Sequence, residues 1–466
     1  MKVFSVLLIL IIALPIKSPR IFSREVLFEI RADQVKQQIE GFGVSGAWWA
    51  QDVGGWSQVN RDRITDLLFD QQKGIGLTIY RYNIGAGSGK NIIDPWRNTE
   101  TFEVEEGKYD WSRDENAVRI MKEAHRKGVT NIIAFVNSPP ARMTKTGYVT
   151  GGKEGKSNLR EDMYDDFAQY LVDIVRHFRE DESLPVKWIS PINEPQWNWN
   201  NSKGQEGCHY TTDEIVEVIK VLLEKIEEEK LDVGVSAVDA GEWKTSYIYM
   251  DRLFLNKYIN DRTDHFAVHS YWSTTRQKEK ASRYFREQYP DKKLWMTEWT
   301  EMKKGVDYGM DSGLTMANVI HEDLVIAGVT SWQYWIAVSK YNYRDGLIYT
   351  DQYTENIRET KRLWILGNYS NFIRPGYKRI KVSGQHNDLR LSAYINGDRD
   401  RLVVVAINNS KKSREFVLDL VNFDGNKLDI YRTSETENLE HTYSGKVIKE
   451  FKLPARSVTT MVLTRL

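Results

Sequence analysis

The most constraining feature of this 466-residue sequence is an alternation, repeated eight times, of short apolar runs with amphipathic stretches. The apolar runs are typical of buried strands and cover residues 39–48, 77–85, 131–140, 186–195, 232–240, 265–272, 292–299 and 331–338. Helical spacing marks the segments between them, such as residues 60–72, 114–127, 162–178, 212–230 and 312–327. Eight strand–helix units favour an α/β fold of the (β/α)8 TIM-barrel type over an open doubly wound sheet.

The C-terminal part of the chain has a different pattern. After a further helical stretch over residues 355–371, β-forming residues cluster between turns at 391–395, 401–408, 415–420, 427–431 and 457–465. Residues 26–39 also have strand character and precede the first barrel strand. We therefore expect a small β-domain beside the barrel, which the N-terminal strand could join so that both chain ends build it.

The N-terminus predicts export. Met1 and Lys2 precede an apolar run over residues 3–16, which is the pattern of a secretory signal. No A-x-A cleavage site follows, so residues 1–24 are expected to be a signal peptide or, alternatively, an uncleaved N-terminal anchor. The expected location is secreted or extracellular, with a membrane as partner only if the segment is uncleaved. Cys208 is the single cysteine, so no intrachain disulfide can form.

Composition narrows the ligand class. Lys plus Arg number 65 and Asp plus Glu number 65, so no net charge draws the chain to nucleic acid, and no nucleic-acid partner is expected. The apolar residues are spread along the chain, which excludes a polytopic membrane protein. The 15 Trp and 24 Tyr are unusual, because such rings stack well on sugar faces. A tryptophan-rich core is the alternative, and it accounts for more than half of them.

Polar residues gather where the predicted strands end, which is the face of a barrel that carries an active site. Glu194 and Glu298 each follow a strongly apolar run, where a carboxylate is costly unless function requires it. Two such carboxylates can flank a glycosidic bond, one as general acid/base and one as nucleophile. We predict these roles for Glu194 and Glu298 respectively; solvated strand-end carboxylates are the alternative.

The motifs around these residues resemble known enzymes. Asn193-Glu194-Pro195 resembles the acid/base signature of the clan A glycoside hydrolases, and Thr297-Glu298-Trp299 resembles their nucleophile strand. Resemblance to glycoside hydrolase family 30 extends over the mature chain through Gly41-Phe42-Gly43, Trp48-Trp49, Asn137-Ser138-Pro139-Pro140, His269-Ser270-Tyr271-Trp272 and Phe372-Ile373-Arg374-Pro375-Gly376. It implies a catalytic barrel over residues 39–372, a β-sandwich side domain of residues 25–38 plus 373–466, and retention of anomeric configuration.

Within that family the sequence is most like the endo-β-1,6-galactanase branch, through Trp48-Trp49 and Gly54-Gly55-Trp56. The leading hypothesis is therefore a retaining endo-β-glycanase acting on a β-linked plant polysaccharide or oligosaccharide. A glucuronoxylan endo-β-1,4-xylanase, or an exo-acting β-glucosidase or β-xylosidase, would share its catalytic residues. A non-catalytic carbohydrate-binding protein is the hypothesis from another class, and the presence of both Glu194 and Glu298 argues against it.

The resemblance also implies roles for neighbours of the two glutamates. Asn193 resembles the donor to the sugar 2-hydroxyl, and Arg81 and Tyr271 resemble the residues that bond the nucleophile. His269 has no second His or Cys at ligand spacing, so no metal and no cofactor are expected. The predicted substrate-binding residues are Trp48, Trp49, Arg81, Asn83, Asn137, Arg142, Asn193, Trp197, His269, Tyr271, Trp272 and Trp335.

Arg142 departs from the family pattern, because relatives usually have an aromatic residue at that position. An arginine there could stack on a sugar face or pair with a uronate carboxylate. An ordinary loop salt bridge is the interpretation that we favour over both.

Overall fold

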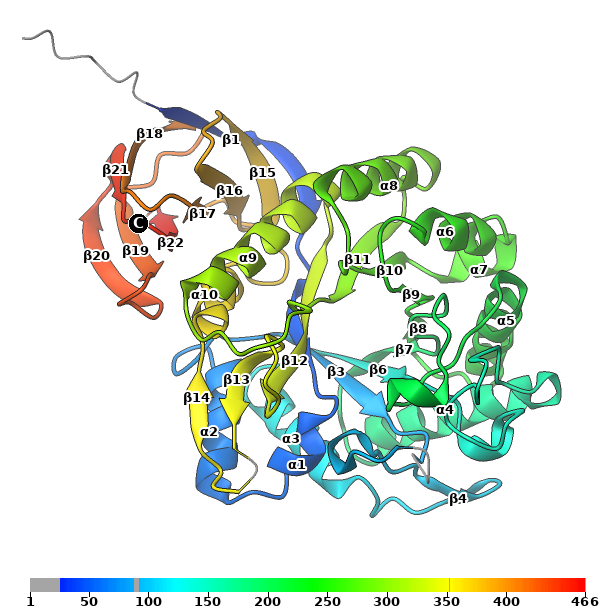
Figure 1. The fold of residues 1–466 in the computed structure, drawn as a ribbon. Helices are drawn as coiled ribbons and strands as arrows, with labels where there is room; N and C mark the ends of the chain where they lie inside the picture. Colours follow the sequence, from blue (N-terminus) through cyan, green and yellow to red (C-terminus); the bar gives the residue numbers. More distant parts are fainter. Residues whose placement is uncertain (1–25, 88–91, 352, 466) are drawn as a thin grey trace, which may run out of the picture.

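The computed structural model describes residues 26–87, 92–351 and 353–465. Figure 1 shows a barrel of strands and helices with a smaller β-domain beside it. The predicted signal peptide or anchor, residues 1–24, lies outside the described residues. In the described part of the chain, no helix combines the length and the apolar character needed to span a membrane.

The barrel is formed by parallel strands from all eight predicted apolar runs. Its fifth strand is split into two short pieces, of which the first pairs with the preceding barrel strand and the second with the following one. The first and eighth strands pair on the other side and close the ring, which confirms the predicted fold class. The strands are β2 (Gly41–Ser45), β3 (Ile79–Ile84), β6 (Asn131–Val136), β7 (Val186–Ser190), β8 (Gly234–Val235), β9 (Asp239–Ala240), β10 (His265–His269), β11 (Lys293–Glu298) and β12 (Ser331–Ser339).

Helices cover the outside of the barrel (Figure 1). Their apolar faces pack on the strands, and local signals set their ends; Thr211 and Glu214, for example, form a capping box at the start of α5. The helices are α2 (Gln58–Phe69), α3 (Glu115–Arg126), α4 (Tyr164–Glu180), α5 (Thr212–Glu228), α6 (Ser246–Phe254), α7 (Lys257–Arg262), α8 (Thr275–Gln288), α9 (Met310–His321) and α10 (Lys361–Ser370). A π-helical turn, Glu322–Ala327, extends α9.

The helix predicted over residues 355–371 begins later than expected. Thr360 caps α10 by accepting a hydrogen bond from the backbone N–H of Leu363. The residues before it form β14 (Ile357–Glu359), which pairs with β13 (Gly346–Thr350). This hairpin was not predicted, because its short strands lie inside a stretch that also has helical spacing.

The side domain is a curled β-sheet that takes strands from both ends of the chain. The N-terminal strand, β1 (Leu27–Gln38), runs antiparallel to β15 (Lys378–Ser383) and parallel to β18 (Arg414–Val421). The other strands are β16 (Leu389–Ile395), β17 (Arg401–Asn408), β19 (Lys427–Thr433), β20 (Glu440–Lys446), β21 (Glu450–Leu453) and β22 (Ser457–Thr464). The N-terminal strand is thus part of the side domain, as its sequence pattern suggested.

The side domain packs directly on the barrel. Figure 1 shows it against α9 and α10, and Val403, Val405 and Val462 belong to the same buried apolar cluster as the barrel core. Across the contact, the Asn368 side chain donates to Thr460 Oγ1 at 3.0 Å, and Thr460 Oγ1 donates to the Asn368 carbonyl at 2.7 Å. One face of the side-domain sheet therefore packs into the barrel core, whereas other side-domain residues, among them Phe28, Leu391 and Phe451, form a separate apolar cluster.

Candidate active site

The two predicted catalytic glutamates meet at the carboxyl ends of the barrel strands. Glu194 follows β7, and Glu298 ends β11. One carboxylate oxygen of each and one ring nitrogen of His269 lie within 4.8 Å of one another. Retaining glycosidases have carboxyl groups about 5–5.5 Å apart, and inverting ones about 6.5–9.5 Å. Carboxylate oxygens this close agree with the shorter separation, which favours direct attack by one carboxylate.

Glu298 is held by two donors. Arg81 Nη1 donates to Glu298 Oε2 at 3.0 Å, and the Tyr271 hydroxyl donates to Glu298 Oε1 at 3.0 Å. Burial raises the pKa of Glu298, whereas the positive charges on His269 and Arg81 oppose that rise. The net shift of that pKa is upward, because burial and the Glu194 charge outweigh the two positive charges; Arg81 and Tyr271 fix the direction of the free lone pair of the carboxylate.

A buried aspartate completes the setting of Arg81. The guanidinium is fully buried, and its Nη2 lies 3.1 Å from Asp239 Oδ2 at the end of the fifth strand. Ser190 and Thr297 each donate a hydroxyl hydrogen bond of 2.6 Å to Asp239. Burial alone would raise the pKa of Asp239, but the Arg81 and His269 charges and the two hydroxyls outweigh it, so the pKa is lowered. An ionised Asp239 balances the Arg81 charge.

Sequence analysis missed Asp239 although its signal was present. Asp239 is the next to last residue of the fifth apolar run, so it lies at the carboxyl end of the predicted strand, where a barrel carries its active site. The residues around Asp239, Val233 to Ala240, are small and apolar and contain no motif of the kind that marks Glu194.

Glu194 is fixed through its backbone and its carboxylate. Its N–H donates to the Asp239 carbonyl at 2.8 Å, and the Trp199 indole donates to its carbonyl at 2.9 Å. These bonds hold a left-handed backbone (φ 46°), which is uncommon for a residue with a side chain and is frequent at functional sites.

His269 bridges the pair of glutamates. Its Nδ1 lies 2.9 Å from Glu194 Oε1 and 3.7 Å from Glu298 Oε1. Burial lowers the pKa of His269, but the Glu298 and Glu194 carboxylates together raise it by more, so the net shift is upward. A protonated imidazole between the two carboxylates reduces their mutual repulsion.

Three asparagines form a chain beside the glutamates. Asn193 Nδ2 donates to Asn137 Oδ1 at 3.1 Å, and Asn137 Nδ2 donates to Asn83 Oδ1 at 3.0 Å. At the two ends of the chain, Asn193 Oδ1 and Asn83 Nδ2 have no hydrogen-bond partner among the described residues. One acceptor and one donor are thus oriented by their neighbours and left to bind hydroxyl groups.

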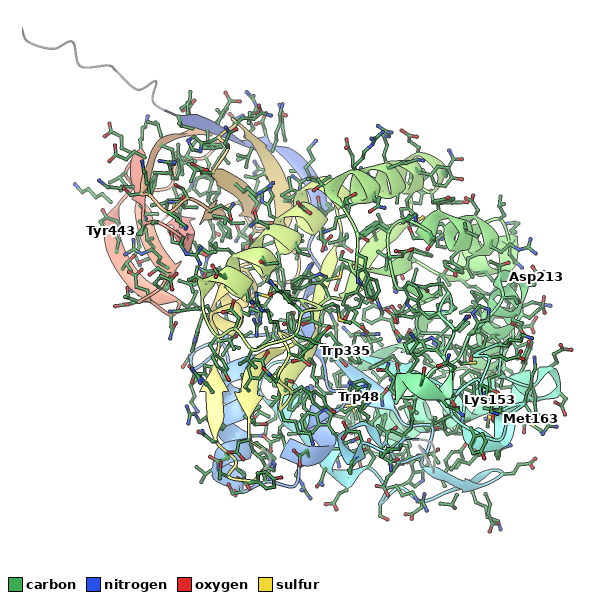
Figure 2. The ribbon with its side chains drawn as sticks, viewed as in Figure 1. Trp48, Lys153, Met163, Asp213, Trp335 and Tyr443 are labelled. Atoms are coloured by element: carbon green, nitrogen blue, oxygen red, sulfur yellow. The ribbon has the colours of Figure 1, made fainter. Side chains whose placement is uncertain are left out.

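Four of the five predicted site tryptophans form two pairs, and the fifth lies apart from them. Trp48 and Trp335, labelled near the centre of Figure 2, meet edge to face at 5.3 Å, and Trp197 and Trp272 do so at 5.5 Å. Trp49 begins the short helix α1 (Trp49–Val53), has no exposed surface and donates its indole hydrogen to the Ser45 carbonyl at 2.8 Å. Its prediction as a substrate contact is therefore corrected, because consecutive side chains point in different directions and only Trp48 lies beside the other site tryptophan.

Arg142 lies in a bidentate ion pair. Its Nε and Nη2 donate to the two carboxylate oxygens of Glu103 at 2.9 and 2.7 Å, and Asp166 lies 3.7 Å away. The Glu103 side chain is 3% exposed, so the pair is anchored in the protein. These are the contacts of a loop salt bridge; a role of Arg142 in substrate binding stays a prediction.

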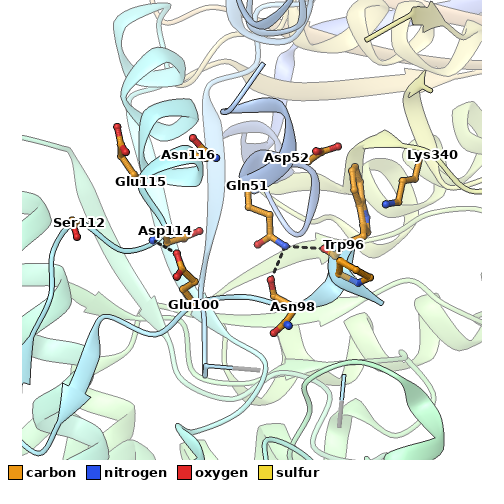
Figure 3. A pocket seen from close by; sticks show the side chains of 11 residues that line it. Gln51, Asp52, Trp96, Asn98, Glu100, Ser112, Asp114, Glu115, Asn116 and Lys340 are labelled. Carbon is orange, nitrogen blue, oxygen red and sulfur yellow. Dashed lines mark hydrogen bonds between the residues drawn. The ribbon is translucent and has the colours of Figure 1, made fainter. Parts of the chain in front are cut away.

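Two cavities open near the site. One, of about 540 Å³, adjoins the Trp48–Trp335 pair and is lined also by Arg97, Lys304, Tyr341 and Asp345. The other, of about 470 Å³, lies between α1 and the start of α3 and contains neither catalytic glutamate (Figure 3). Burial raises the pKa of its Asp114 to about 8. Neither cavity is lined by a catalytic glutamate; the first adjoins the predicted contact residues Trp48 and Trp335, and the second is a separate acidic hollow.

A metal ion bound by the two glutamates and His269 would lie close to positively charged side chains. The carboxylates of Glu194 and Glu298 and the His269 ring have the spacing of metal ligands. However, Glu298 is already bonded to the Arg81 guanidinium at 3.0 Å, and the His269 pKa is raised, so a metal ion would face two positive charges. The expected absence of a metal or cofactor stays a prediction.

Comparison with known proteins gives the family. The profile of O-glycosyl hydrolase family 30 matches residues 25–349, and that of the glycosyl hydrolase family 30 beta sandwich domain matches residues 376–461. The chain belongs to glycoside hydrolase family 30. It is accordingly a retaining glycoside hydrolase, and the resemblance seen in its motifs is confirmed.

Relatives within family 30 differ in the substrate that they are named for. An endo-beta-1,6-galactanase of Hypocrea rufa is 24% identical over 79% of this chain and 78% of its own length. The glucuronoxylanase XynC of Bacillus subtilis (strain 168) is 27% identical over 84% of this chain and 86% of its own. A solved structure of a conserved exported protein from Bacteroides fragilis is 29% identical, has a TM-score of 0.85, and covers 94% of this chain and 100% of its own.

Proposed function

We propose that this family 30 protein is an endo-acting hydrolase of a β-linked plant polysaccharide, with β-1,6-galactan as substrate. Glu194 is its general acid/base and Glu298 its nucleophile. The observation that carries the proposal is the pair of buried carboxylates with oxygens within 4.8 Å, at the open end of the barrel. The similarity to the Hypocrea rufa endo-beta-1,6-galactanase supports the choice of sugar.

In the first step, a Glu298 oxygen attacks the anomeric carbon while the glycosidic bond breaks. The Glu194 proton passes to the departing glycosidic oxygen, so that the leaving sugar departs as an alcohol and an ester joins the remaining sugar to Glu298. Tyr271 and Arg81, each 3.0 Å from Glu298, orient the attacking oxygen.

In the second step, water breaks the glycosyl ester. Glu194, now ionised, takes a proton from the water as its oxygen attacks the anomeric carbon, and Glu298 leaves as a carboxylate. Two inversions restore the β-configuration. Asn193 is suited to accept a hydrogen bond from the sugar 2-hydroxyl through its free Oδ1 as positive charge develops, and not to donate one as the resemblance implied, because its Nδ2 donates to Asn137.

Glucuronoxylan is the second candidate substrate, and a specific observation favours it. Arg97 and Lys304 both line the cavity beside Trp48 and Trp335, and two cations there could hold a uronate carboxylate. The similarity to the glucuronoxylanase XynC points the same way. With Arg142 engaged by Glu103, this cavity is a better candidate for acid recognition than the Arg142 loop.

The test is product analysis on arabinogalactan, β-1,6-galactan, glucuronoxylan and aryl β-glucosides. Release of β-1,6-galacto-oligosaccharides, seen first as the β-anomer by NMR, is the expected result. Aldouronic products would establish the glucuronoxylan alternative, and monosaccharide alone would indicate exo action. Turnover of none of these would leave the carbohydrate-binding alternative.

We also propose that residues 1–24 direct export of the enzyme, because a polysaccharide substrate lies outside the cell. The likeness to a conserved exported protein supports this. Recovery of active enzyme from the culture medium is expected; activity that stays with the membrane fraction would support the uncleaved anchor.

A further inference from the structure

Trp272 is an exposed tryptophan in an unfavourable backbone conformation. It follows β10, directly after the nucleophile's partner Tyr271, and 59% of its surface is exposed. Its φ of 47° is left-handed, which is a genuine outlier for a bulky residue. A strained backbone opposes folding, and the exposed ring gains little burial energy that would offset the strain. Such strain persists where the surroundings enforce it, often at ligand sites.

The surroundings that enforce it are a buried polar network under the loop. Ser270, two residues before Trp272, accepts a hydrogen bond from the Trp243 indole at 2.8 Å and donates to Asp323 Oδ1 at 2.8 Å. Lys278 Nζ lies 2.9 Å from the same Asp323 oxygen, and both side chains are almost fully buried. Asp323 belongs to the π-helical turn after α9, a type of irregularity frequent at functional sites. The exposed ring is thus carried on a rigid support.

The ring stands on the same side of the site as Glu194. Trp272 meets the Trp197 ring edge to face, at 5.5 Å and 86°. A Cβ atom built on Gly241 would lie 2.9 Å from both Trp197 Nε1 and Glu194 Oε1. Both side chains therefore pack against the backbone of Gly241. Glycine is required there, because a side chain would displace the Glu194 carboxylate. The tryptophan pair therefore adjoins the proton donor, on the side where the leaving group departs.

Gln196 adds a polar group at the same place. The built Gly241 Cβ would come within 2.2 Å of its Nε2, so its amide also packs on this backbone. In the described part of the chain neither Nε2 nor Oε1 of Gln196 has a hydrogen-bond partner. An unpaired buried amide is costly, and it would gain from turning to sugar hydroxyls.

We infer that Trp272, braced by Trp197, is the stacking platform for the leaving-group sugar, and that Gln196 binds hydroxyls of that sugar. The inference rests on the proposed role of Glu194 as proton donor and adds the position and the nature of the leaving group. The platform binds a pyranose ring through its C–H face, so the preferred leaving group is a sugar and not a small aglycone.

The test compares two substrates that share the glycone. One is the polysaccharide that the wild type hydrolyses; the other is the glycosyl fluoride of its repeating unit, whose leaving group is too small to reach Trp272. For Trp272→Ala we expect the ratio of kcat/KM on polysaccharide to kcat/KM on fluoride to fall about tenfold or more. Trp272→Phe should recover part of it. Transfer of glycosyl groups from the fluoride to an added sugar acceptor should fall in parallel, because the acceptor occupies the same place.

Tyr353→Ala is the matched control, since Tyr353 is an aromatic residue 86% exposed on the loop between β13 and β14; its ratio should equal that of the wild type. Gln196→Ala should lower the ratio by about threefold to tenfold. Equal losses on both substrates for Trp272→Ala would overturn the platform, whereas the proposed function would stand. A wild type that cleaves the fluoride but no polysaccharide would defeat both.

Discussion

The buried ring of His321 predicts how the free energy of unfolding changes with pH. It ends α9, where the helix packs on the side domain, and is 8% exposed. Its Nδ1 has no hydrogen-bond partner among the described residues. Burial lowers the pKa of His321 from 6.5 to about 3, and the nearby positive charges of Arg390 and Arg379 act in the same direction. The ring is therefore neutral in the folded protein down to acidic pH.

The sign and size of the effect follow from proton linkage. Above pH 6.5 the ring is neutral in both the folded and the unfolded chain, so it has no influence on the pH dependence. As the pH falls below 6.5, the unfolded chain binds a proton that the folded protein refuses until about pH 3. Stability then falls by about 1.4 kcal/mol per pH unit, or about 2.7 kcal/mol between about pH 8 and pH 4.5.

Urea unfolding of the wild type and of His321→Leu at these two pH values measures the effect. All 15 Trp lie between residues 48 and 364, so their fluorescence follows the barrel, which contains α9. The difference in unfolding free energy between variant and wild type should shift by about 2.7 kcal/mol in favour of the variant at about pH 4.5. His386→Leu, at a partly exposed position of the side domain, is the control. A His321→Leu difference that stays constant within about 0.5 kcal/mol would refute the reasoning.

Four further predictions concern the site. Glu298→Gln should abolish turnover, because an amide cannot attack the anomeric carbon, and azide should restore a product of inverted configuration; more than about a tenth of the wild-type rate would contradict the assignment. Glu194→Gln should slow substrates with poor leaving groups far more than activated aryl glycosides, and equal damage to both would exclude it as proton donor. His269→Phe removes a cation between two carboxylates, so the pH profile of kcat/KM should move to higher pH; an unmoved profile would mean that the ring is neutral. Arg142→Ala should change kcat/KM on galactan and glucuronoxylan modestly and alike, because Glu103 occupies the guanidinium; a loss on glucuronoxylan alone would favour uronate binding.

The barrel was predictable because its signals are local. Eight runs, such as the one that becomes β6, are predominantly apolar, as is typical of strands buried on both faces, and their ends carry polar residues that share one face of the barrel. The positions of Glu194 and Glu298 at strand ends, together with their motifs, were enough to predict their place in the site. The register of these strands brings Arg81 and Tyr271 within 3.0 Å of Glu298, the residue that the resemblance implied they bond.

What sequence could not give depends on contacts between distant segments. Asp323 lies on an ordinary amphipathic stretch, and only the fold brings it under Ser270, 53 positions away. Trp48 and Trp49 are equivalent by composition and both are buried, but consecutive side chains point in different directions, so only Trp48 lies against Trp335. Arg142 was open to three interpretations because its partner, Glu103, is 39 positions away, at the start of the short strand β4 (Glu103–Glu105).

Strand β1 and strand β22 lie in the same sheet, on either side of β15, β16 and β17. A pulling force on the two chain ends is therefore carried across the hydrogen bonds of the side domain, and the barrel bears no tension until β1 has sheared from β15 and β18. The side-domain sheet thus carries a force applied at the chain ends, so that the geometry around Glu194 and Glu298 is not distorted by that force.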